Sequence, residues 1–473
     1  MKNLSPLHML TAALSMTWVL FAVASPAWAA EKEIRYQKLH FAMGGHEVGW
    51  TESKDLQTAT GYRFERKTYI KLQRGAIQVE MNTQSTALTD RSLKPVSFRY
   101  QKQDAAGLFV IEGKAEGDDM LITTHSAGSK VNNRLAMPTD LTFASASDHW
   151  VRQNLNQKGH LERQVLVEEM GAIAPMTFFV EKMNNGHHQV NATLAGMHMV
   201  EEIDQSGLTV IARTPALGAV AYPFGLSPPE GTSPGSIDML ARSTWPAPYV
   251  PTSAQKVVYR VHTPDADSFA VPSDRRQKIL NRTKQFVEIE VNRSSSTIGG
   301  LSKQERSEFT QETPYEAIND QRLVRVAREQ TKGARTTREK VERLNTFVFK
   351  HVNAKSLDRG YAAATATLES RSGDCTEHSV LLSALLRSLH IPTRLVDGVV
   401  VDGGRAGYHE WVEVQVDNEG FIPADPTFGE FPASPLRLKL AEGSSSPQGL
   451  LHLGISAGRM LRPEVRVEVV AHQ

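Results

Sequence analysis

Three residues in the last third of the chain together supply the parts of a cysteine-dependent acyl transfer. Cys375 is the only cysteine among 473 residues, and His409 and Asp425 follow it in that order. A thiolate attacks a carbonyl carbon to form a thioester, an imidazole serves as its base, and a carboxylate holds the imidazole tautomer. Taken singly, Cys375 could also be a quiet buried thiol and His409 a polar surface residue.

Cys375 is expected in the first turn of a helix. Asp374 is a suitable N-cap, and Glu377 at the third helical position completes a capping box. The unpaired N–H groups and the dipole at this end favour a thiolate and could stabilise an oxyanion. Gly373 removes a side chain where a substrate backbone could approach. Leucines at helical spacing predict a buried stripe further along: Leu381, Leu382, Leu385, Leu386 and Leu389.

His409 is expected on a strand that pairs with the segment before Asp425. Valines alternate with polar residues over 408–416 and look core-facing, which turns His409 and Trp411 to the opposite surface. A loop at Asn418-Glu419-Gly420, with Gly420 in the left-handed conformation, predicts a hairpin that places His409 and Asp425 on one face. Their offset along the strands stays open, because prolines flank Asp425.

The segment from Leu368 to Thr427 resembles the transglutaminase-like superfamily of papain-type cysteine enzymes. The resemblance rests on "GDCTEHSVLL", "LLRSLHIPTR", "HEWVEV" and "DPT", which stand in the family's order. It implies that Cys375 is the nucleophile, that His409 is the general base and acid, and that Asp425 orients His409. His390 departs from the glycine usual before Ile-Pro, in a left-handed helix cap that histidine tolerates at modest cost.

A second oxyanion donor is harder to assign from the sequence. Asn353, at the end of the preceding helix, is the candidate, and a helix-capping role for it is equally compatible with its position. No cofactor is expected. A metal site is not expected either, because His187-His188 and His198 lack further ligands at suitable spacing.

The resemblance leaves the reaction open, since members of this superfamily cross-link glutamine to lysine, deamidate, hydrolyse amides or are inactive. The leading hypothesis is an exported enzyme that acts on amide bonds of protein or peptide substrates through a thioester, as a protease, an amidase or a transglutaminase. The alternative is a catalytically silent envelope scaffold or binding protein with a transglutaminase-like domain.

The elements around these residues predict an α+β protein. Residues 1–29 read as a signal peptide cleaved after Ala29, with an uncleaved anchor as the alternative, so a periplasmic or secreted location is expected. Period-two alternation and turn signals over 30–262 predict an antiparallel β-rich region. Residues 263–313 read as a polar connector, and 314–473 as the transglutaminase-like (papain-like) α+β domain.

The charge composition limits the classes of binding partner to expect. The chain has 53 basic and 52 acidic side chains, a balance that gives no reason to expect nucleic acid or an anionic membrane as partner. No apolar run after the signal segment approaches the length of a membrane span. The expected partner is a protein or peptide substrate, and the oligomeric state stays open.

Overall fold

The computed structural model describes residues 31–157, 159–194, 197–230, 232, 237–293, 301–359, 361–417, 419–460, 462 and 464–473. The expected cleavage after Ala29 and the expected loop residue Asn418 lie outside the described residues. No helix in the described part of the chain is long and apolar enough to cross a membrane.

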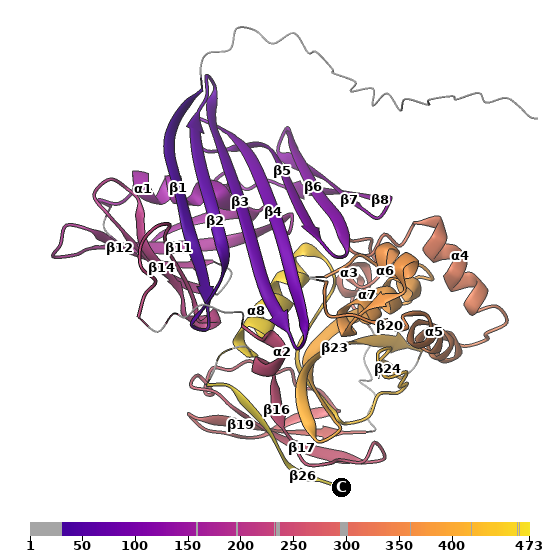
Figure 1. Ribbon diagram of the computed structural model, residues 1–473. Helices are drawn as coiled ribbons and strands as arrows, with labels where there is room; N and C mark the ends of the chain where they lie inside the picture. The colour runs from indigo at the N-terminus through magenta and orange to yellow at the C-terminus, as the bar shows by residue number, and fades with distance from the viewer. Residues whose placement is uncertain are drawn as a thin grey trace, which may run out of the picture.

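The N-terminal region forms a 15-stranded sheet made of two meanders (Figure 1). The strands lie in the order β8 to β1 and then β15 to β9, so the pairing of β1 with β15 joins the meanders. The first meander comprises β1 (Lys32–Met43), β2 (His46–Gln57), β3 (Gly61–Arg74), β4 (Ile77–Asp90), β5 (Pro95–Asp104), β6 (Gly107–Glu116), β7 (Asp119–Ser126) and β8 (Ser129–Ala136). The second comprises β9 (Thr142–Phe143), β10 (Leu161–Val167), β11 (Ala172–Lys182), β12 (His188–Leu194), β13 (Met197–Ile203), β14 (Thr209–Thr214) and β15 (Ala219–Pro223).

Apolar side chains on one face curve this sheet around a helix. Helix α1 (Ala144–Gln153) packs against β3 and β4 of the first meander and against β9 and β10 of the second. Phe64, Phe98 and Phe143 are buried in the core between them. The period-two pattern of the sequence therefore marks strands with one face turned inward, as expected for an antiparallel sheet.

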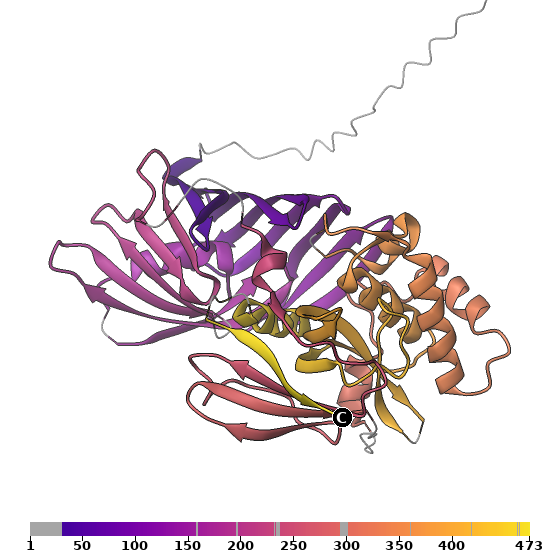
Figure 2. The ribbon, with the colours of Figure 1, turned by 60° about the horizontal axis from the view of Figure 1, so that its bottom comes forward.

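A separate four-stranded sheet contains the last strand of the described chain (Figure 2). It consists of β18 (Gln277–Arg282), β19 (Phe286–Asn292), β17 (Lys256–His262) and β26 (Arg466–His472), in that order. The sequence analysis assigned residues 256–262 to the N-terminal β-rich region because they alternate. In the structure this segment is β17, which pairs with β19 and β26. Alternation identifies a strand and says nothing of its partner. The segment read as a connector contains β18, β19 and α3 (Lys303–Glu308).

The remaining elements form a helical layer against a five-stranded sheet, which confirms the α+β class. The sheet comprises β16 (Thr244–Pro246), β22 (Thr393–Asp402), β23 (Arg405–Val416), β24 (Gly420–Ala424) and β25 (Arg437–Gly443). The other elements are η1 (Pro215–Leu217), α2 (Met239–Arg242), α4 (Gln321–Gln330), α5 (Thr337–His351), β20 (Ala354–Lys355), α6 (Ala364–Ser370), β21 (Ser372–Gly373), α7 (Cys375–Arg387) and α8 (Pro447–Met460).

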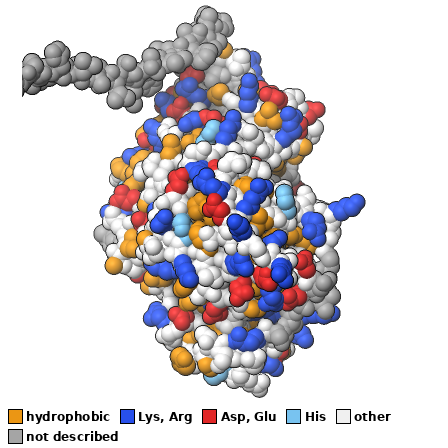
Figure 3. Space-filling view, turned by 90° about the vertical axis from the view of Figure 1, so that its right-hand side faces the viewer, with side chains coloured by type: hydrophobic (Ala, Val, Ile, Leu, Met, Phe, Trp, Pro, Cys, Tyr) orange, Lys and Arg blue, Asp and Glu red, His pale blue; other side chains and the backbone are white. Residues whose placement is uncertain are grey.

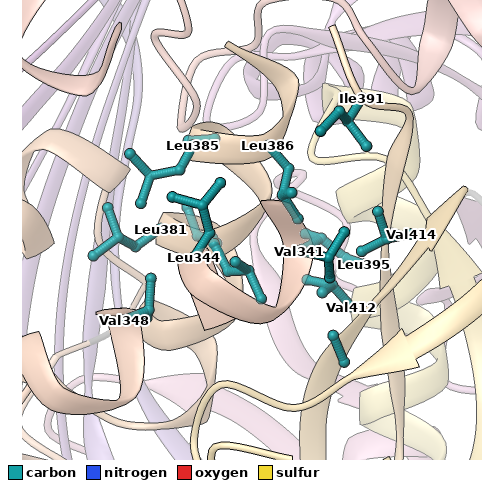
Figure 4. Close-up of a cluster of buried hydrophobic side chains, with 14 of the residues drawn as sticks. Val341, Leu344, Val348, Leu381, Leu385, Leu386, Ile391, Leu395, Val412 and Val414 are labelled. Carbon is teal, nitrogen blue, oxygen red and sulfur yellow. The ribbon is translucent and has the colours of Figure 1, made fainter. Parts of the chain in front are cut away.

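Helix α7 is the centre of this part of the molecule. Its leucines point to α5 on one side and to the valines of β23 on the other (Figure 4). Leu381, Leu385 and Leu386 are fully buried, as the helical spacing predicted. Because α7 packs on every side, the position and direction of its first residue, Cys375, are fixed by the core.

The end of α7 confirms the conformation expected from the sequence. His390 has φ 57°, in the left-handed region. Its N–H donates to Arg387 O at 2.8 Å, and the N–H of Ile391 donates to Leu386 O at 3.1 Å. These bonds close the helix and direct the chain into β22.

Replacing His390 with glycine should stabilise the protein, because glycine adopts positive φ without the steric cost of a Cβ. His390→Gly is expected to raise the free energy of unfolding by about 1 kcal/mol in urea denaturation. Ser388→Gly is the matched control: Ser388 has φ −64°, so glycine there should lower stability by about 0.5 kcal/mol. Lower stability for His390→Gly would show that its side chain contributes more than the strained backbone costs.

Candidate active site

Cys375 is the first residue of α7, and the capping box expected before it is present. Asp374 Oδ1 accepts from the N–H of Thr376 at 2.9 Å, and Glu377 Oε2 accepts from the N–H of Asp374 at 2.9 Å. The second oxygen of Glu377 accepts from the N–H of Ala362 at 3.0 Å. The helix start is therefore held from two directions, and Cys375 as a whole residue is intermediate in exposure.

Gly373 is needed by the packing of the helix start itself. A Cβ on Gly373 would lie 2.3 Å from Cβ of Glu377 and 2.6 Å from its Cγ. The glycine therefore makes room for the capping carboxylate of the same helix, which leaves the expected substrate approach without support.

His409 and Asp425 meet as the sequence predicted. Val416 pairs with Gly420, which has φ 78°, and this register carries the chain to Ala424 opposite Val412. Asp425 follows immediately, and its Oδ2 lies 2.9 Å from His409 Nε2. Since Nε2 faces the carboxylate, Nδ1 is the ring atom left for proton exchange with a thiol.

The carboxylate of Asp425 has a second partner that the sequence analysis missed. Arg437, the first residue of β25, donates from Nε to the same Oδ2 at 2.9 Å. Burial alone would raise the pKa of Asp425, but the charges of His409 and Arg437 and their hydrogen bonds hold it below its usual range. Asp425 is therefore ionised at neutral pH. Arg437 lies outside every motif, and no local pattern marked it.

The face of β23 that carries His409 and Trp411 was expected at the surface, and this was wrong. His409 is 4% exposed and Trp411 is 1% exposed. Trp411 lies against Arg276 and Gln277, at the start of β18. The ring of His409 stacks on Trp411 at a centroid distance of 6.1 Å and contacts the edge of Phe428 at 5.5 Å. The four-stranded sheet covers this face of β23. The alternation of residues along a single strand could not indicate that cover.

The surroundings of Cys375 oppose ionisation of the thiol more than the helix terminus alone suggested. Burial, followed by the carboxylates of Asp374 and Glu410, raises the pKa of Cys375 well above its ordinary value. The backbone N–H of Glu410 and the guanidinium of Arg74 act in the other direction. The thiol is thus expected to stay protonated at neutral pH until a base accepts its proton.

Two buried carboxyl groups lie behind the thiol on neighbouring strands. Asp397 of β22 pairs with Glu410 of β23. Burial raises the pKa of Asp397 to about 7. Burial, with the charge of Asp397 next, raises the pKa of Glu410 well above its ordinary value. Both shifts favour the protonated form of these carboxyl groups, and negative charge on Glu410 is one of the causes of the raised pKa of the thiol.

A lysine that the sequence analysis did not consider lies near the thiol. Lys355 Nζ lies 3.3 Å from His378 Nε2 and 3.4 Å from Thr427 O. Burial lowers the pKa of Lys355, while the negative charges of Asp425 and Cys375 act against that shift. Burial lowers the pKa of His378 to about 4. Neutral His378 can then donate from Nδ1 to Asp374 O at 2.6 Å and accept from Lys355.

Asn353, the expected oxyanion donor, is exposed and lines an open hollow of about 750 Å³ beside α5. Phe347, His351 and Arg371 also line this hollow. Among the described residues, no hydrogen bond joins Asn353 to Cys375 or His409. Figure 3 shows this side of the molecule, where positive and negative side chains are intermingled.

Comparison with known families agrees with the resemblance read from the motifs. The profile described as "Transglutaminase-like superfamily" matches residues 324–426, which include Cys375, His409 and Asp425. This confirms the resemblance and leaves activity to experiment. No curated protein matches the chain.

Solved structures match parts of the chain at low identity. A candidate cysteine protease from Cytophaga hutchinsonii is 13% identical, with 48% of this chain and 82% of that chain covered and a TM-score of 0.31. The periplasmic domain of TgpA from Pseudomonas aeruginosa, bound to ethylmercury, is 14% identical, with 38% and 93% covered and a TM-score of 0.28. A β-barrel-like protein of a domain of unknown function from Brucella abortus is 12% identical, with 38% and 83% covered and a TM-score of 0.25.

The raised pKa of the thiol makes the contribution of His409 measurable. At about pH 7, iodoacetamide should label Cys375 roughly 100-fold faster in the wild type than in His409→Ala, because the imidazole takes the thiol proton. The difference should vanish at a pH above the pKa of the thiol, where hydroxide removes the proton in both. His452→Ala, on α8 and exposed, is the control. Equal rates at neutral pH would exclude His409 as the base.

Proposed function

We propose that this chain, whose residues 324–426 match the transglutaminase-like superfamily, is an exported enzyme that transfers acyl groups from amide bonds through a thioester on Cys375. The observation that carries the proposal is the buried Asp425 bonded to His409 at 2.9 Å, with the chain's one cysteine at the N-terminus of α7, which packs against the strand of His409. Burying an ion pair costs desolvation free energy, and well-packed apolar residues would hold the strand at least as well. The pair is therefore more readily explained by a chemical role.

His409 acts first as a base. Its Nδ1 accepts the proton of Cys375 while Asp425 stabilises the imidazolium through Nε2. The sulfur then forms a bond to the amide carbon, and the carbonyl electrons move to oxygen. Because the thiol has a raised pKa, proton transfer and attack are coupled and no standing ion pair is needed.

The negative charge that develops on the carbonyl oxygen must be stabilised by hydrogen-bond donors or a cation. The backbone N–H of Cys375 lies in the first turn of α7, where helical partners are missing. Lys355 supplies a cation close to the same sulfur, and an ammonium stabilises an oxyanion more strongly than a neutral donor does. His409 returns its proton to the departing nitrogen as the C–N bond breaks, which leaves the thioester.

Water or a primary amine then resolves the thioester, giving hydrolysis or transfer. The substrate class that we propose is a protein or peptide, because the exposed Lys355 and the partly exposed Cys375 can be reached from the surface by an extended chain segment. The signal-like residues 1–29 support action outside the cytoplasm.

A silent scaffold is the second candidate, favoured by the burial of His409 and the raised pKa of the thiol. Both features are also expected of a closed site in which Cys375 never becomes acylated. The two candidates differ in what happens when Cys375 is removed.

Incubation of unfolded casein with the full chain, with and without a fluorescent primary amine, tests the proposed enzyme. Mass spectrometry should find deamidated or cleaved casein without the amine and fluorescent casein with it. Cys375→Ala should abolish every product. If wild type and Cys375→Ala give the same products, or none, the scaffold becomes the better account.

Lys355 should matter for turnover more than for thiol reactivity. Lys355→Met is expected to lower kcat/KM by about 100-fold, with a smaller fall in alkylation rate. Lys355→Arg should retain part of the activity because it keeps the charge. Lys350→Met, exposed on α5, is the matched control. Unchanged turnover in Lys355→Met would return the oxyanion role to Asn353, which Asn353→Ala then tests.

A further inference from the structure

The longest hairpin of the N-terminal sheet ends at the catalytic helix. Strands β3 and β4 have 14 residues each, and their turn lies next to α2 and close to β23 (Figure 1). Gly75, at the tip, has φ 65°, so the turn is a tight one that suits glycine. The tip residues are Arg74, Gly75, Ala76 and Ile77.

Hydrogen bonds to the segment before α2 hold the tip of this hairpin in place. The N–H of Gln73 donates to Ile237 O at 3.0 Å, and the N–H of Gly75 donates to Asp238 Oδ1 at 3.0 Å. The same oxygen of Asp238 caps α2 by accepting from Leu240 N–H at 3.0 Å. Backbone bonds on both sides of Arg74 thus fix where its side chain starts.

Arg74 binds the N-cap of the cysteine helix and the loop that borders it. Its Nη1 donates to Asp374 Oδ2 at 3.0 Å, to Leu357 O at 3.2 Å and to Arg359 O at 3.2 Å. The two carboxylate oxygens of Asp374 have different partners. Oδ1 caps the helix, and Oδ2 accepts the hydrogen bond from Arg74. One guanidinium therefore connects the helix start, the 357–359 loop and the N-terminal sheet.

We propose that Arg74 is a positioning residue of the candidate active site: it counters the charge of the carboxylate beside Cys375 and ties the 357–359 loop to the start of α7. The N-terminal sheet then completes the catalytic site and is more than an attached module. This inference rests on the proposed nucleophilic role of Cys375.

The charges that face Cys375 come from several elements, so the effect of Arg74 can be separated from theirs. The groups that interact electrostatically with the thiol are Asp374 at the N-cap of α7, Tyr408 and Glu410 on β23, Lys355 on β20, and Arg74. The other titratable groups of the candidate site are Glu377 and His378 on α7, His409 on β23 and Asp425 after β24. Asp374 raises the pKa of the thiol and Arg74 lowers it. Without Arg74, the negative charge of Asp374 acts on the sulfur with one opposing positive charge fewer.

Other contacts keep the sheet docked when Arg74 is changed. Lys102 Nζ, near the β5–β6 turn, donates to Tyr361 O at 3.1 Å. Ser129 Oγ, at the β7–β8 turn, donates to Asp320 Oδ2 at 2.7 Å. Replacing Arg74 therefore removes a charge from the site without removing the interface.

The test is the pH dependence of iodoacetamide labelling of the single cysteine in the full chain. Arg74→Gln should shift the midpoint of labelling upward by about one pH unit. Asp374→Asn, which keeps a good N-cap, should shift it downward. The double variant should fall between the two single variants. Lys71→Gln, exposed on the same strand, should leave the midpoint unchanged.

Labelling does not require turnover, so this proposal and the proposed enzymatic function fail separately. An unchanged midpoint in Arg74→Gln, while Asp374→Asn shifts, would overturn the role of Arg74 even if casein is still processed. The predicted pattern of shifts would support it even if no product is found. The urea midpoints of all four variants show whether the comparison is made between folded proteins.

Discussion

The candidate active site depends on one buried charge, the carboxylate of Asp425. Asp425 is fully buried, and an unpaired carboxylate in such a place would cost several kcal/mol. His409, Arg437 and the N–H of Thr427 together satisfy its two oxygens. The pairing of β25 with β22 brings Arg437 to the site, so the far edge of the sheet helps to fix the tautomer of His409.

The second constraint is the thiol itself, which the protein keeps protonated. Burial and the N-cap carboxylate work against the helix terminus, so a cysteine at this position is not automatically a thiolate. In the proposed mechanism, Cys375 is therefore unreactive until His409 takes its proton. Such a thiol is also protected from oxidation in an oxidising compartment, because the thiolate is the form that oxidants attack.

Local patterns predicted the parts of the site that local structure determines. The capping box of Asp374 and Glu377, the leucine stripe of α7, the left-handed His390 and the hairpin leading to Asp425 were all legible in the sequence. The loop glycine Gly420 predicted that His409 and Asp425 share a face, and the structure supplies the offset that the sequence left open.

What the sequence could not show comes from distant segments. Arg437, Lys355 and Arg74 belong to no motif, and only the tertiary fold brings them to Cys375 and Asp425. The burial of Trp411 likewise depends on a second sheet that one strand's alternation cannot reveal. The sequence analysis also did not foresee that Gly373 gives room to Glu377, a contact set by the conformation of the chain just before α7.

The most direct measurement of the central claim is to catch Cys375 carrying an acyl group. The full chain is mixed with unfolded casein, quenched in acid after a short time and digested, and the peptide that contains Cys375 is examined by mass spectrometry. The account predicts an acyl adduct on that cysteine in the wild type and its absence in His409→Ala. Products formed without any adduct, or an equal adduct in His409→Ala, would contradict it.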